Sequence, residues 1–183
     1  MKVFDYQQII DKYYPAGTLR RDIYMKHSRQ VADLAIEIAD RCGLDLDRGE
    51  IEAAAMLHDV GICLTKAPTI GCEGDVRYIC HGPLGARLLA DEGAPDYCVR
   101  VAETHTGAGI TADDVEQLQL PIPVKDYCPK TLLEKLVCYA DKFYSKSGDM
   151  ERKTFQQARG LISHHGGDAL ARFDALAALF GKA

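Results

Sequence analysis

The chain has 183 residues, a formal net charge of −5, and apolar and charged fractions of 47% and 27%. These are the proportions of an ordinary globular protein, and the length favours one domain. The negative charge argues against a protein that binds nucleic-acid polymers or membrane surfaces, because both attract positively charged proteins.

No stretch of the sequence is long and apolar enough to span a bilayer, and the N-terminus lacks the pattern of a secretory signal. The seven cysteines are scattered and form no Cys-x-x-Cys pair, which argues against a disulfide framework or a thiolate zinc site. We therefore expect a cytoplasmic protein.

The hydrophobic period of the first sixty residues is helical. It predicts helices over about 5–13, 20–41 and 47–59, with breaks at Pro15-Ala16-Gly17 and at Gly43. A Gly- and Pro-containing stretch over 60–80 follows. It is too long for a simple connector, and loops of this length often line a functional site.

The second half of the chain also has a helical period and nowhere sustains an alternation of period two. We expect an all-α protein, a compact helical bundle of irregular topology. The predicted helices cover about 82–92, 95–105, 111–117, 130–146, 150–163 and 168–180.

Six ionisable side chains fall on the apolar faces or at the ends of five of these helices. His27, for example, precedes Val31 and Leu34 at helical spacing. Any one of the six could be a hydrogen-bonded core histidine or a capping aspartate. Six together favour a metal site, because buried ionisable groups are costly unless they are paired or bind metal. The six are His27, His58, Asp59, His81, His105 and Asp141.

Imidazole and carboxylate ligands without thiolate suit a divalent transition metal, namely Fe, Mn, Co, Ni or Zn. Neighbours on a helix diverge by about 100°, so His58 and Asp59 could bind different ions, or Asp59 could bridge two. One divalent ion on Asp59 and Asp141 gives a neutral site. Two ions leave a charge of about +2, which would attract phosphate and lower the pKa of a bridging water.

The order His27, His58-Asp59, Asp141 resembles that of the HD-domain metal-dependent phosphohydrolase superfamily, and AAAMLHDVG resembles its HDIG subgroup. HGPLGARLL at 81–89, ETHTGAGIT at 103–111 and LLEKLVCYADK at 132–142 add to the match. The resemblance implies a single domain over 1–183, with an HD core of about 20–146 and C-terminal helices at 150–180 packed on it. It also implies that all six residues bind metal, with Asp59 as the bridging ligand between two ions.

Many members of the superfamily have a lysine directly after the HDxG motif, where this sequence has Ile62. Lys66 is the nearest basic residue and is a candidate to bind phosphate in its place. Arg77, Lys142 and Lys146 are further candidates, and the predicted helix over 130–146 places the two lysines one turn apart. The alternative for all four is an exposed basic side chain.

The resemblance implies hydrolysis of a phosphoester in a nucleotide or related small metabolite, through a metal-bound hydroxide, with His58 and Asp59 in the catalytic centre. We expect no nucleic-acid polymer and no membrane as a partner. Two alternatives stay open: a mixed-valent di-iron oxygenase of the HD type, and a non-catalytic signalling module that binds a nucleotide. The last helix carries Ala169, Phe173 and Phe180 on one face, which indicates core packing first and a homodimer contact second.

Overall fold

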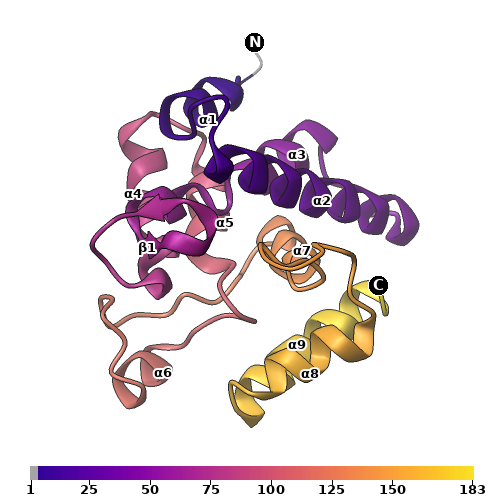
Figure 1. Ribbon diagram of the computed structural model, residues 1–183. Coiled ribbons are helices and arrows are strands. Elements are labelled where there is room, and N and C mark those ends of the chain that lie inside the picture. Colours follow the sequence, from indigo (N-terminus) through magenta and orange to yellow (C-terminus); the bar gives the residue numbers. More distant parts are fainter. Residues whose placement is uncertain (1–3) are drawn as a thin grey trace.

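The computed structural model describes residues 4–183 (Figure 1). Residues 1–3, which begin the segment where we expect no signal sequence, lie outside this range. The fold is helical, which confirms the all-α prediction. The helices are α1 (Gln7–Tyr13), α2 (Leu19–Cys42), α3 (Arg48–Leu57), α4 (His81–Asp91), α5 (Asp96–Thr104), α6 (Ala112–Gln117), α7 (Leu132–Asp141), α8 (Phe155–Ser163) and α9 (Gly167–Phe180).

Helix ends fall where side chains can cap them. The Thr18 side chain accepts a hydrogen bond from the Arg21 backbone and begins α2, and Gly43 ends that helix with φ +61°. Thr111 and Asp114 form a capping box at the start of α6. Such local signals explain why most predicted boundaries fall within a few residues of the observed ones.

The stretch over 60–80 is a chain of short turns. It contains the 3-10 helices η1 (Val60–Leu64), η2 (Pro68–Ile70) and η3 (Tyr78–Cys80), and two antiparallel strands of two residues each, β1 (Lys66–Ala67) and β2 (Cys72–Glu73). The sequence did not indicate these strands, because two residues are too few to show an alternating pattern.

The predicted helix over 130–146 was too long, because α7 ends at Asp141. Lys142 is its C-cap and Lys146 lies in the connection that follows, so the two lysines are not one helical turn apart as predicted. The residues after Phe143 include Ser145, Ser147 and Gly148, which have low helix propensity. The next helix begins at Phe155 rather than near 150, because Thr154 and Gln157 form a capping box that fixes its start.

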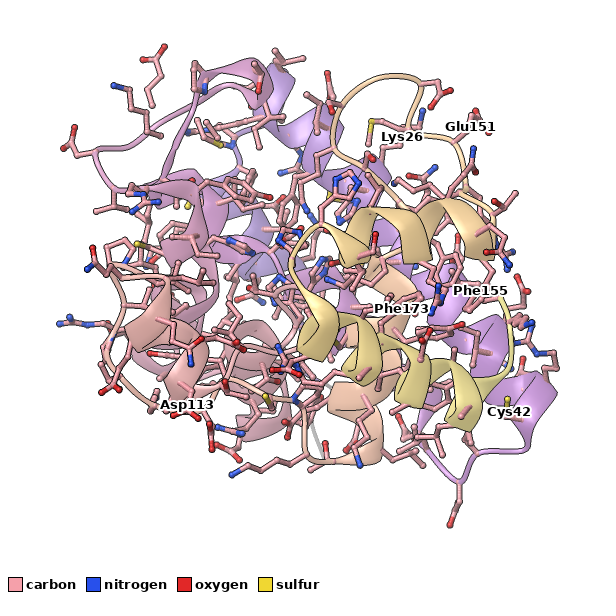
Figure 2. All side chains as sticks on the ribbon, turned by 90° about the horizontal axis from the view of Figure 1, so that it is seen from below. Lys26, Cys42, Asp113, Glu151, Phe155 and Phe173 are labelled. Carbon is pink, nitrogen blue, oxygen red and sulfur yellow. The ribbon has the colours of Figure 1, made fainter. Side chains whose placement is uncertain are left out.

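Helices α2, α3, α5 and α7 meet in the core, and the α8–α9 hairpin lies against α7 (Figure 1). Aromatic rings make this last contact. Tyr139 of α7 lies 5.5 Å from Phe173 and 5.7 Å from Phe180 between ring centroids. Phe155 of α8 stacks on Phe173 at 5.8 Å, and both are labelled in Figure 2. The apolar face of α9 is therefore used inside the chain, and a homodimer stays a prediction.

No helix among residues 4–183 is long and apolar enough to cross a membrane.

Gly61 lets η1 approach α4 closely. A Cβ atom at this position would overlap the carbonyl oxygen of His81 and the backbone nitrogen of Gly85. Both neighbours are backbone atoms, so a side chain here would push the segment that follows Asp59 away from the helix that begins at His81.

We expect Gly61→Ala to lower the free energy of unfolding by about 1–3 kcal/mol, the usual cost of forcing extra atoms into a packed interior. Gly160→Ala is the matched control, because a Cβ atom at this position of α8 would meet no other atom within 4 Å. That change should stabilise the protein by about 0.5–1 kcal/mol. Urea unfolding of both variants measures the difference, and equal midpoints would contradict the packing argument.

Candidate metal centre

Four buried side chains from three helices meet at one point. His27 lies in α2, His58 and Asp59 follow α3, and Asp141 ends α7. His27 Nε2 lies 3.1 Å from Asp59 Oδ2, 3.0 Å from Asp141 Oδ1 and 3.3 Å from His58 Nε2. His58 Nε2 lies 3.0 Å from Asp59 Oδ2 and 3.3 Å from Asp141 Oδ1. The four ligand-type atoms therefore surround a common centre.

A second group shares Asp59 with the first. His81 Nε2 and His105 Nε2 lie 3.1 Å apart. The Oδ1 atom of Asp59 is 3.2 Å from the His105 nitrogen and 3.4 Å from the His81 nitrogen. Asp59 thus contributes one of its carboxylate oxygens to each group. The structure brings together all six residues that the sequence singled out.

These distances fit metal coordination. With metal–ligand bonds of about 2.1 Å, neighbouring ligand atoms lie about 3.0 Å apart in an octahedron and about 3.4 Å apart in a tetrahedron. The observed separations cover 3.0 to 3.4 Å. Asp59 Oδ2 is buried, nitrogen atoms of His27 and His58 lie within 3.1 Å of it, and Lys146 Nζ lies 2.6 Å from it. The nitrogen and oxygen atoms therefore converge at separations that the ligands of an ion would have.

Backbone carbonyls orient three of the histidines. Each directs its Nδ1 at the carbonyl oxygen three residues earlier, and since a carbonyl only accepts, Nδ1 must carry the proton. In the neutral ring Nε2 then holds the lone pair that a metal needs. The pairs are His58 with Ala55 at 2.6 Å, His81 with Tyr78 at 2.7 Å, and His105 with Ala102 at 2.9 Å.

The first group contains two buried carboxylates. Burial by itself would raise the pKa of Asp59 and Asp141, but neighbouring cations outweigh burial and hold both pKa values well below the usual range. Burial would likewise lower the pKa of His58, yet the two carboxylates raise it to about 9. Both aspartates are therefore ionised at neutral pH and attract a cation.

The second group differs in its protonation. Burial lowers the pKa of His81 to about 3 and also lowers the pKa of His105. Both rings are neutral at pH 7, which is the form that binds a metal.

The four basic residues predicted to bind phosphate lie at different distances from the candidate metal centre. Lys146 Nζ lies 2.6 Å from Asp59 Oδ2, inside the centre. Lys142 Nζ lies 2.6 Å from Asp141 Oδ2 and donates to the His105 carbonyl at 2.9 Å. Lys66 is exposed and lines an open cavity of about 490 Å³ together with Lys146. Arg77 is exposed, and within residues 4–183 it has no ion-pair partner.

Tyr78 is a site residue that the sequence did not indicate. Its carbonyl orients His81, and the two rings lie 4.7 Å apart between centroids. Its side chain borders the Lys66–Lys146 cavity and also a second cavity beside His81. Tyr78 lies in an irregular segment without periodicity, so its three-residue spacing to His81 was the one available signal.

A family model described as "HD domain" matches residues 24–145. The match includes all six residues of the candidate centre and ends before α8 and α9. It confirms the superfamily predicted from the motifs, whereas the HDIG subgroup stays a prediction.

Two relatives of similar sequence are named as tRNA methyltransferases and not as HD-domain proteins. A tRNA (cytidine(56)-2'-O)-methyltransferase of Picrophilus torridus is 39% identical over 68% of this chain, and one of Thermoplasma volcanium is 32% identical over 83%. The matched region is 32% and 39% of the length of these two proteins. An uncharacterised protein of Methanocaldococcus jannaschii is 35% identical over 64% of this chain and 63% of its own length.

The fold is similar to the HD domain of the L. monocytogenes phosphodiesterase PgpH. The TM-score is 0.54 at 16% sequence identity, with 94% of this chain and 95% of the other covered. The same domain in complex with cyclic-di-AMP gives a TM-score of 0.53 at 14% identity, with 97% and 98% covered. At this identity the likeness concerns the fold.

Binding of a divalent metal to the first group should release a proton. The pKa of His58 is raised to about 9, so this ring is protonated at pH 7, whereas a histidine ligand must be neutral. Affinity should therefore increase with pH between 7 and 9, by up to about tenfold per pH unit for one proton. Calorimetric titration with Mn²⁺ in two buffers of different ionisation enthalpy measures the release, and identical heats would contradict it.

Proposed function

We propose that this chain, which belongs to the HD domain family, is a metal-dependent phosphohydrolase that acts on a nucleotide or another small phosphoester. The observation that carries the proposal is the pair of ligand groups joined by Asp59, with separations between ligand atoms of 3.0 to 3.4 Å. A family of hydrolytic metal centres and a phosphodiesterase of similar fold support the same chemistry.

We propose that His27, His58, Asp59 and Asp141 hold one divalent ion, and that His81 and His105 hold a second with the other oxygen of Asp59. Two such ions would polarise a phosphoryl oxygen and lower the pKa of a water molecule. Two divalent ions on two aspartates leave a charge of about +2, which favours an anionic substrate.

Lys146 and Lys66 are the basic residues best placed for the phosphate. Both line the cavity of about 490 Å³, and Lys146 reaches the centre itself. A cation bound to Asp59 would free the Lys146 ammonium for a phosphate oxygen. Lys142 already has two partners in the protein, the Asp141 carboxylate and the His105 carbonyl, so we assign it to positioning Asp141.

The methyltransferase name of two relatives describes proteins of which this chain matches about a third. The buried cluster of histidines and aspartates gives no reason for methyl transfer, whereas it fits phosphoester chemistry. The relatives do act on RNA by name, so a short RNA belongs in the substrate panel beside nucleoside phosphates and cyclic dinucleotides. Cyclic-di-AMP, the ligand of the similar PgpH domain, is the first member to test.

His58→Ala and Asp59→Ala should lose metal and should reduce hydrolysis by about 100-fold or more. His81→Ala and His105→Ala should retain one ion per chain where the wild type holds two. Metal content by mass spectrometry and turnover over the substrate panel are the measurements. The exposed His164 is the control, and His164→Ala should match the wild type.

Full metal content in both His58→Ala and Asp59→Ala would rule out the ligand assignment. The di-iron oxygenase alternative uses the same six ligands, so the assay is repeated without oxygen. A hydrolase keeps its activity under those conditions and an oxygenase stops. Tight nucleotide binding without turnover of any substrate would favour the signalling module.

Lys146→Ala should raise the KM for a phosphoester by about 10- to 100-fold, because a hydrogen bond from a charged group is worth about 1.5–3 kcal/mol. Lys130→Ala at an exposed position outside the site is the matched control. Steady-state kinetics at saturating metal measure the KM of both variants. An unchanged KM with a lower metal content would instead assign Lys146 to the metal centre.

A further inference from the structure

A second cavity, of about 350 Å³, adjoins the metal centre on the side of His81. Tyr78 and His81 form one wall, and the loop over 106–110 and helix α6 contribute another. The α8–α9 hairpin closes the cavity with Ile162 and Ala169. Because the family match ends at residue 145, these last two residues belong to a part of the chain outside the matched HD core.

The lining of this cavity is mainly apolar. Ile79, Leu118, Leu120, Ile162 and Ala169 all contribute. Leu118 is 63% exposed at the rim, which leaves an apolar side chain in water unless a ligand covers it. A ligand with apolar faces would gain about 25 cal/mol for each Å² of apolar surface that it removes from water here.

The charges in the cavity cancel. Arg172 and Asp114 both line it, and the guanidinium lies 2.8 Å from the carboxylate oxygen. Among residues 4–183, the other basic residues that line this cavity are His81 and His165, and no lysine does, in contrast to the neighbouring cavity that Lys66 and Lys146 line. Tyr78 borders both, so a cavity lined by two lysines and a cavity without a lysine meet beside the candidate metal centre.

One polar atom of the cavity residues lacks a partner. Arg172 uses its Nη2 for Asp114 and for the Gly109 carbonyl, whereas its Nε is buried without a hydrogen bond. Leaving such a donor unsatisfied costs about 1–3 kcal/mol. A ligand that hydrogen-bonds Arg172 needs an acceptor atom, which a heteroaromatic ring has and an alkyl group lacks.

We infer that this cavity holds the nucleobase end of a nucleoside phosphoester, and that the α8–α9 hairpin determines which organic group is accepted. The inference rests on the proposed function and deepens it. The volume of about 350 Å³ is at the lower end of the range of small-molecule sites, so it suits one nucleoside. The phosphate then lies at the metal centre and the Lys146 side, and the uncharged base lies between apolar walls.

The test compares a substrate that fills the cavity with one that does not. Adenosine 5′-monophosphate carries a nucleoside, and methyl phosphate has none. Ala169→Phe should lower kcat/KM for the nucleotide by about 10- to 100-fold through KM, and should change that for methyl phosphate by less than about threefold. Ala171→Phe, an exposed position on the same helix, is the matched control and should change neither.

A second variant avoids loss of folding. Leu118 is largely exposed, so Leu118→Asp should fold normally and should also raise KM for the nucleotide alone. Binding of adenosine, measured by calorimetry on the metal-free protein, gives a readout without turnover. Wild type should bind adenosine, and both variants should bind it at least about tenfold more weakly.

The outcomes separate the two proposals. Turnover of methyl phosphate with no preference for the nucleotide, or equal effects of Ala169→Phe on both substrates, would overturn the inference and leave the hydrolase intact. No turnover of any phosphoester would overturn the proposed function, and adenosine binding that Ala169→Phe abolishes would still support the cavity assignment. Absence of adenosine binding to the wild type would overturn that assignment.

Discussion

The structure depends on the buried carboxylate of Asp59, which faces two pairs of imidazoles with its two oxygens. A buried charge of this kind is tolerated only when cations or a metal compensate it. Histidines converge on each oxygen, and the Lys146 ammonium lies 2.6 Å from Oδ2. The six side chains of the centre lie in or just after five helices, namely α2, α3, α4, α5 and α7, which therefore have to be packed so that these positions meet.

Much of the centre could be predicted from the sequence, because its six residues occupy positions that a helical period assigns to the interior. His27 lies on a face with Val31 and Leu34, and its burial follows from that spacing. The residues around these six side chains were harder to predict from the sequence. Helix α7 ends at Asp141, and the low helix propensity of the residues after Phe143 is only a weak signal for this end. Lys146 reaches Asp59 from the connection that follows, so its position depends on where α7 ends. Tyr78 lies in a segment whose shape comes from tertiary contacts, which no local pattern records.

The chain combines a family core with an addition. Residues 24–145 match the HD domain, and the hairpin of α8 and α9 follows this region and packs on α7 through Phe173 and Phe180. The six candidate metal ligands lie in the first part, while Ile162 and Ala169 of the second border the apolar cavity. The proposed metal ligands and the proposed determinants of selectivity therefore lie in different segments of the chain.

The carbonyl groups that hold His58, His81 and His105 belong to the same short helical turns as the histidines themselves. Each ring is therefore oriented by its own segment of backbone, and the lysine ammonium already balances the shared carboxylate. The orientation of each imidazole is thus set by residues three positions away in the sequence, and a substitution that breaks one of these short turns would misalign its own ring and leave the other two in place.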